Sequence, residues 1–467
     1  MASRAAAAPA RPRLAECVTG GVLARAFPLD TVHAILADTG RASQRERELP
    51  AHVMVYYVIA LALYMPASYG EVLRTLLDGA RWLAGPDADP HVACRSAISQ
   101  ARTRLGEAPL AALFARVVHP VATAATPGAH YRRWRTVGVD GTTFDVADTA
   151  ANARAFGRPA ASQGVHGRSA FPQLRLAALV ETGTHVIFGA ALGRYATHEL
   201  TLAPAVLAHL RPDMLCLADR AFPSFDLWQA AAATGAALLW RIRKDARRPV
   251  LERYADGSYR SELRATYHTR ADDRTPQPVR VIAYTLPKVR DAAPVYRLIT
   301  TILDPDAAPA AELAALYHER WEVESTFDEL KTHLKGAQLV LRSRTPALVR
   351  QEVYGLLLAH YAVRGLLHEA AATASAGPRD PDTLSFLHAV RVVRRSLPRF
   401  AAVSPSGPSV GVAGPARRAP ARAVRGARGH EPRARRAARR QTQDDALPGA
   451  PPTTASQSSR RLHGAGT

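Results

Sequence analysis

The order of apolar runs between residues 134 and 243 constrains the fold more than any other feature of the sequence. Five runs have the lengths and the alternating or continuously apolar character of β-strands, and helical patterns separate the later ones. Strands and helices in this order favour a mixed sheet with helices packed on it, an α/β fold. The strand-like runs begin at Trp134, Gln173, His185, Asp213 and Ala237, and the helical patterns begin at His198 and Phe225.

The regions on either side of these runs have different patterns. Residues 14–130 are mostly helical in pattern, and their longest apolar run, 53–65, is short for a membrane span and predicts a buried helix. Two interpretations stay open for the helix at 96–106: Arg102 and Arg104 contact DNA phosphates, or they belong to a solvated basic face. Residues 244–301 have short alternating runs and predict a β-rich insertion.

One helical face near residue 320 carries an unusual mixture of side chains. At about 100° per residue, four of its residues fall within an arc of about 60°. Phosphodiester cleavage needs such a mixture, because a carboxylate holds a metal ion while cations and a hydroxyl position phosphates. The alternative is a solvated helix face, since such faces commonly mix charges. The four residues are Tyr317, Arg320, Glu324 and Lys331.

Two isolated aspartates follow strand-like runs and favour the metal-site interpretation. Asp140 precedes Gly141, which we expect to form a turn, so its carboxylate should lie at the exit of a strand. Asp219 ends another apolar run and precedes a helical pattern. For a single aspartate, a role in a turn or helix cap is the more common explanation. Asp145 and Asp148 are weaker candidates because they lie beyond the expected turn.

These segments together resemble the three signature segments of the DDE transposases of the insertion-sequence-4 family, the subgroup with a Tyr-Arg-Glu-Lys signature. The resemblance covers about residues 14–400. Three motifs in the right order, with a long insertion before the glutamate, make the signal specific. The motifs are Asp140-Gly141-Thr142, Asp219-Arg220-Ala221-Phe222, and Tyr317, Arg320, Glu324 and Lys331 at the family's spacing.

The resemblance implies a ribonuclease-H-like mixed sheet with a β-rich insertion, preceded by a helical N-terminal domain. On this basis we expect a DNA-binding domain at 1–130, the first part of the catalytic core at 131–243, and the insertion at 244–301. The second part of the core, with the signature helix, should occupy 302–400. Residues 401–467 lose apolar periodicity and predict a disordered basic tail, which departs from the family.

The implied activity is cut-and-paste DNA transposition. Asp140, Asp219 and Glu324 would be the catalytic residues and would hold two Mg²⁺ ions, for which Mn²⁺ can substitute. The partners would be double-stranded DNA, as terminal inverted repeats and target, and a second copy of the chain in a homodimeric synaptic complex. The residues expected to contact DNA are Tyr317, Arg320, Lys331, Trp321, Tyr296, Arg220 and Lys335.

Composition agrees with a DNA enzyme. The formal net charge of +21 favours a polyanionic partner. Residues 401–467 hold twelve Arg and three acids, a net charge of +9, which leaves +12 on residues 1–400. Three scattered cysteines indicate neither a disulfide framework nor a zinc site. Without a signal segment or membrane span, we expect a cytoplasmic, nucleoid-associated bacterial protein.

Two other functions stay open at this stage. The first is a transposase-derived DNA-binding protein that is inactive or acts as a repressor. The second is a ribonuclease-H-like nuclease without strand transfer. The intact acidic triad argues against a pure binding protein, whereas the unusual tail keeps that alternative open.

Overall fold

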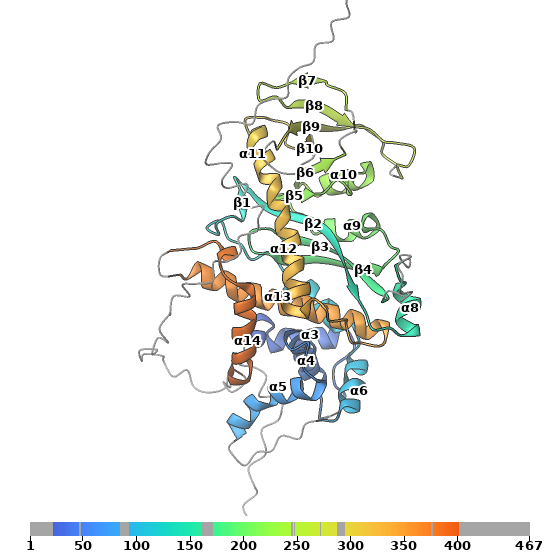
Figure 1. Cartoon of the computed structure of the whole chain (residues 1–467), viewed down its shortest axis with the longest axis vertical. Coiled ribbons are helices and arrows are strands. Elements are labelled where there is room, and N and C mark those ends of the chain that lie inside the picture. The colour runs from blue at the N-terminus through green and yellow to red at the C-terminus, as the bar shows by residue number, and fades with distance from the viewer. Residues whose placement is uncertain are drawn as a thin grey trace, which may run out of the picture.

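The computed structural model describes residues 22–400 except 46–47, 85–92, 160–170, 244–245, 247, 271, 287–294 and 375–376. The predicted basic tail at 401–467 lies outside the described residues. Along its long axis the molecule has a helical part, a central sheet with the signature helix across it, and a β-rich end (Figure 1).

The centre of the molecule is one mixed sheet with the order β4-β3-β2-β5-β6-β10-β9-β8-β7. β2 pairs antiparallel with β3, β3 pairs antiparallel with β4, and β2, β5 and β6 run parallel. This arrangement confirms the predicted ribonuclease-H-like core. The strands are β2 (Trp134–Asp145), β3 (Gln173–Glu181), β4 (Val186–Arg194), β5 (Met214–Ala218) and β6 (Ala237–Ile242), with the short β1 (His130–Tyr131) paired to β2.

The β-rich insertion is present, and it continues the core sheet. β10 pairs antiparallel with β6 and then with β9, so the insertion extends the open edge of the core. All five residues of β5 are buried, as expected for a central parallel strand covered on both faces. The added strands are β7 (Glu252–Arg253), β8 (Tyr259–Leu263), β9 (Gln277–Tyr284) and β10 (Tyr296–Thr300).

The N-terminal region is helical, as predicted. Its apolar helix α4 (Ala51–Leu63) is buried from Val53 to Leu63 and packs on α13 (Pro346–Ala372), which follows the signature helix in the chain. None of the helices in the described part of the chain combines the length and apolarity that crossing a membrane requires. The other helices of this region are α2 (Val22–Ala26), α3 (Leu29–Asp38), α5 (Tyr69–Ala84), α6 (Arg95–Leu105) and α7 (Ala108–Val117).

The signature helix is not a uniform α-helix, which corrects the helical-wheel prediction in detail. It follows α11 (Ala310–Leu316) and consists of a 3-10 turn, η1 (Tyr317–Arg320), then α12 (Trp321–Asp328), then a π-helical segment, η2 (Glu329–Gly336). The 3-10, α and π segments have different numbers of residues per turn. Side-chain directions calculated at 100° per residue therefore become inaccurate along the segment. The remaining helices are α8 (Ala150–Phe156), α9 (Glu199–Leu207), α10 (Phe225–Ala232), η3 (Pro381–Thr383) and α14 (Phe386–Phe400).

Candidate active site

Asp140 lies inside a strand, and the predicted strand exit at this residue was wrong. β2 continues to Asp145, and Asp140 pairs with Ala178 of β3. On its other edge, β2 pairs in parallel with β5. This pairing ends at Val139 and Ala218. Beyond Val139 that edge of β2 is free of β5.

Asp219 is brought beside Asp140 by the same ladder. Val139 pairs with Ala218, so Asp140 in β2 and Asp219, the first residue after β5, are the next residues along the two chains. Neighbouring strands lie about 4.8 Å apart. The register therefore places two aspartates from distant parts of the sequence on neighbouring backbone segments where β5 ends.

The signature helix, which carries the candidate acid Glu324, packs directly on β2. A Cβ atom at Gly138 would lie 2.5 Å from Cγ2 of Val323, so only glycine allows the helix to come this close. Gly138 and Asp140 are two residues apart and face the same side of the sheet. Glu324, one residue after Val323, is exposed beside them.

Arg320 joins two of the three acids. Its Nη1 donates to Oδ2 of Asp140 at 3.2 Å, and its Nη2 donates to Oε1 of Glu324 at 2.9 Å. The guanidinium is buried. A cation therefore occupies the space between these carboxylates, which is the charge that a divalent metal ion would supply.

The electrostatics of Asp140 fit a cation-binding group. Burial raises the pKa of Asp140 to about 6, although the Gly141 N–H and Arg320 oppose the shift. The negative charges of Glu199 and Glu324 add to the rise. Carboxylates that repel one another at a partly buried site are stabilised by a bound cation, so the residues present fit a divalent metal ion.

The other residues of the signature have different surroundings. Tyr317 is buried, and its hydroxyl donates to the carbonyl oxygen of Ala218 at 3.4 Å. Lys331 is half-buried, and its Nζ donates to Oγ1 of Thr142, two residues beyond Asp140, at 3.2 Å. Tyr317 and Lys331 thus contact the two strands that carry the aspartates.

The predicted DNA contact of Lys335 does not agree with its position. Lys335 is 5% exposed, and its Nζ donates to the carbonyl oxygens of Gly336 and Leu339. It therefore caps the C-terminal end of the signature helix. Arg220, next to Asp219, is exposed at the surface.

The two aromatic candidates differ in accessibility. The Trp321 side chain is 44% exposed, and Cζ of Arg320 lies 5.3 Å from its ring centroid. The ring of Tyr296 is stacked on Tyr284 at 5.3 Å, and Cζ of Arg241 lies 4.4 Å from its centroid. Trp321 is thus open to a ligand, whereas Tyr296 already has protein partners.

A phosphate contact by Arg102 is also excluded in this structure. Arg102 is 1% exposed, and it donates to Gln351 at 2.9 Å, to Tyr69 at 2.8 Å and to Ser343 at 3.0 Å. These bonds tie the N-terminal helices to α13 and the loop before it. Arg102 is therefore a buried connection between two parts of the molecule.

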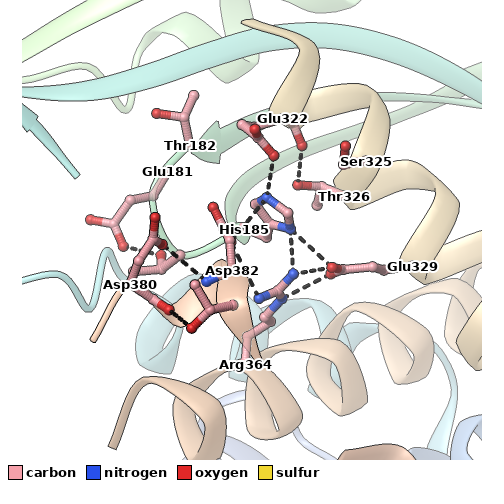
Figure 2. Close-up of polar contacts among 12 residues, drawn as sticks. Glu181, Thr182, His185, Glu322, Ser325, Thr326, Glu329, Arg364, Asp380 and Asp382 are labelled. Carbon is pink, nitrogen blue, oxygen red and sulfur yellow. Dashed lines mark hydrogen bonds and ion pairs between the residues drawn. The ribbon is translucent and has the colours of Figure 1, made fainter. Parts of the chain in front are cut away.

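A buried charge network holds the opposite side of the signature helix (Figure 2). Glu329 accepts from Nε of Arg364 at 2.8 Å and lies 3.3 Å from Nε2 of His360. His185, in the turn between β3 and β4, lies 2.9 Å from Glu329 through Nδ1 and 2.9 Å from Glu322 through Nε2. Glu322 and Glu329 flank Glu324 and thereby fix the helix that carries it.

His185, Glu322 and Asp382 are also close enough together to hold a metal ion. Burial and Arg364 lower the pKa of His185, but Asp382, Glu329 and Glu322 outweigh them and raise it to about 9. Arg364 pairs with Glu329 and lies 3.7 Å from Asp382 within the same group, so these residues form an ion-pair network in this structure.

The sequence reasoning missed Gly138 and Glu199. Gly138 sets the approach of the signature helix, and Glu199, the first residue of α9, lies against Gly141. The available signal was the pair of glycines, 138 and 141, on either side of Asp140 within a strand. Glycine inside a strand often marks close approach of another group.

Comparisons with known proteins agree with the fold and with the motifs. A family model described as the insertion element 4 transposase N-terminal region matches residues 18–115, and one described as the transposase DDE domain matches residues 135–362. The ribonuclease-H-like fold and the matched domain define a DDE transposase, an enzyme that cleaves DNA with divalent metal ions. More narrowly, the chain belongs to the insertion-sequence-4 family of these enzymes.

Individual relatives are consistent with this assignment. Transposase InsG of insertion sequence element IS4 from Escherichia coli K12 is 28% identical over 382 residues, covering 80% of this chain and 82% of the relative. Putative transposase InsZ of the same strain is 25% identical over 206 residues, or 44% and 65% of the two chains. The chain is thus similar to transposases along most of its length.

One solved structure is similar to this chain over most of the length of both chains. It is the cryo-EM structure of the piggyBac transposase synaptic complex with hairpin DNA, with a TM-score of 0.38 and 10% identity over 96% of this chain and 87% of that one. This similarity is too low to support an assignment of residues.

Proposed function

We propose that Asp140, Asp219 and Glu324 form the catalytic centre and hold two Mg²⁺ ions. The observation that carries this proposal is the position of the three acids: the β2–β5 pairing ends one residue before each aspartate, and Arg320 bridges Asp140 to Glu324. When bound, the ions would activate the attacking hydroxyl and stabilise the leaving oxygen. Mn²⁺ would substitute because it prefers the same oxygen ligands.

The side chains around the acids would position DNA. Lys331 and the exposed Arg220 would bind phosphates of the transposon end, and Arg320 would keep Asp140 and Glu324 within reach of each other. Tyr317 supports the end of β5 through its bond to Ala218. Trp321 would stack on a base.

The proposed reaction sequence uses one site for every step. A first nick frees a 3′-hydroxyl, which attacks the opposite strand and gives a hairpin at the transposon end. Resolution of the hairpin and strand transfer into target DNA follow. Two copies of the chain would hold the two terminal inverted repeats in a homodimeric synaptic complex.

The DNA on either side of the gene tests this function. Terminal inverted repeats bounded by a short direct duplication should flank the coding sequence. A linear fragment carrying such an end, incubated with the protein and Mg²⁺, should yield a nicked product and then a hairpin. A protein that binds the end but forms neither product with Mg²⁺ or Mn²⁺ would be a repressor, and the proposed chemistry would be wrong.

Replacing Lys331 by alanine should weaken binding to end DNA and reduce its salt dependence. Each phosphate contact contributes about 0.9 to the slope of log affinity against log salt, so the slope should fall by about that amount. Equilibrium binding at several salt concentrations measures it. Lys331→Arg keeps the charge and should keep the slope; an unchanged slope in Lys331→Ala would place this side chain outside the DNA contact.

Replacing Trp321 by alanine should slow hairpin formation more than the first nick. Extruding a base from the duplex costs a few kcal/mol, and stacking on an aromatic ring offsets about 1–3 kcal/mol of that cost. The hairpin step should therefore slow by roughly ten- to a hundredfold. Time-resolved gels of a labelled end separate the two steps, and Trp321→Phe should retain most of the rate. Equal slowing of both steps would indicate general damage and not loss of stacking.

A further inference from the structure

A fourth acid lies beside the proposed metal site on a different element. Glu199 begins α9, which packs on β2, β3 and β4. Its side chain lies against Gly141 of β2, the residue after Asp140. Glu199 therefore approaches from the face of the sheet opposite to the signature helix, since residues 138 and 141 point to opposite faces of the strand.

Gly141 makes this approach possible. A Cβ atom at residue 141 would lie 2.5 Å from Cδ of Glu199, which is too close for any other residue to be accommodated without moving the carboxylate. Asp140 turns toward the same peptide group, because its Oδ1 accepts the N–H of Gly141 at 2.7 Å. Asp140 and Glu199 thus both lie against Gly141.

Arg175 of β3 fixes the side chain of Glu199. Its Nη1 donates to Oε1 of Glu199 at 2.7 Å, while its Nε and Nη2 donate to the carbonyl oxygen of Tyr195 at 3.2 and 3.1 Å. The Glu199 side chain is 26% exposed, so it is held in place without being sealed from solvent. Among the described residues, the hydrogen bonds of this carboxylate engage Oε1, which leaves Oε2 for a ligand.

The negative charge of Glu199 lies next to the proposed metal ligand Asp140, because the Glu199 carboxylate packs against Gly141, the following residue. On the signature-helix side, Arg320 donates to both Asp140 and Glu324. On the α9 side, Arg175 forms an ion pair with Oε1 of Glu199.

We propose that Glu199 belongs to the divalent-metal site as a fourth carboxylate, reaching the ion or its bound water through Oε2 beside Asp140. This inference rests on the proposed function, since it adds a ligand to the site of Asp140, Asp219 and Glu324. In this proposal Gly141 has a role as well, because the absence of a side chain at this position leaves space for the Glu199 carboxylate.

Mn²⁺ binding by the full-length protein tests this role directly. Electron paramagnetic resonance of free Mn²⁺ gives the affinity without relying on activity. Glu199→Gln keeps an oxygen for Arg175 and removes the charge, and it should weaken binding about tenfold or more. Gly141→Ala, which displaces the carboxylate and leaves the charge intact, should weaken binding in the same direction. Glu312→Gln is the control, because Glu312 binds Tyr131 and Arg132 at another site.

The outcomes separate this inference from the proposed function. Wild-type affinity in Glu199→Gln would overturn the inference. If Asp140→Asn loses Mn²⁺ binding while Glu199→Gln keeps it, only the role of Glu199 is wrong. If Asp140→Asn also binds normally, the metal site itself is misplaced. Thermal melting of each variant establishes that folded protein is being titrated, and Gly141→Ala carries the test if Glu199→Gln does not fold.

Discussion

Alanine at Asp140, Asp219 or Glu324 should abolish DNA cleavage and strand transfer while leaving end binding largely intact. Loss of a metal ligand removes several kcal/mol of transition-state stabilisation, so the rate should fall by about a thousandfold or more. Binding should persist because most affinity for DNA comes from cationic contacts to phosphates. Cleavage of a labelled transposon end with Mg²⁺, and gel-shift binding of the same end, measure the two properties.

Asp145→Ala is the matched control for these variants. Asp145 lies on the same strand as Asp140, is exposed, and accepts from Nε2 of Gln173 at 2.8 Å. Its loss should leave cleavage near the wild-type rate. Mg²⁺-dependent cleavage that survives in one of the three alanine variants would reject the assignment of that residue.

Replacing Arg364 by alanine should destabilise the fold by about 3–5 kcal/mol, because it leaves the carboxylate of Glu329 buried and without its strongest partner. The melting temperature should fall by on the order of 10 °C. Arg116→Ala is the control, since its ion pair with Asp38 is exposed and should contribute no more than about 1 kcal/mol. Similar melting of the two variants would show that the buried network contributes little.

The pH dependence of stability checks the same network. The pKa of His185 is raised from 6.5 to about 9 in the folded protein. A raised pKa means that the stabilisation by His185 is fully present below about pH 6.5 and is lost as the pH rises through about 9. His185 faces Glu322, Glu329, Asp382 and Arg364, so its charge is held by this network. The free energy of unfolding should therefore decline over that window, and His185→Gln should remove the decline.

Much of the fold was predictable because it depends on local patterns. The strand-like runs at 134, 173, 185, 213 and 237 each became a strand, and the apolar run at 53–65 became the buried helix α4. A strand covered on both faces must be apolar throughout, and that requirement is visible in the sequence without knowledge of its neighbours. The continuity of β10 with β6 was not predictable, because strand pairing is a property of two distant segments.

The site was predictable in its residue types but not in its geometry. The spacing on the signature helix and the isolated aspartates indicated the three acids. The strand exit at Asp140 was wrong, because the sequence shows a glycine but not whether it turns the chain or makes room for Glu199. Lys335 was expected to contact DNA, and Arg102 to contact DNA or lie on a solvated face, because charged residues are usually exposed, yet buried partners satisfy both.

The sequence by itself indicated which kind of reaction the protein catalyses. The carboxylates, cations and aromatic groups that a DNA-cleaving site needs belong to residue types that can be identified in the sequence. Only the tertiary structure decided which acids meet. The β2–β5 register sets Asp140 beside Asp219, Gly138 lets the signature helix pack on β2, and Gly141 admits Glu199. These contacts join residues far apart in the chain, and their free energy comes from packing and charge pairing that exist only after the sheet and helices have assembled.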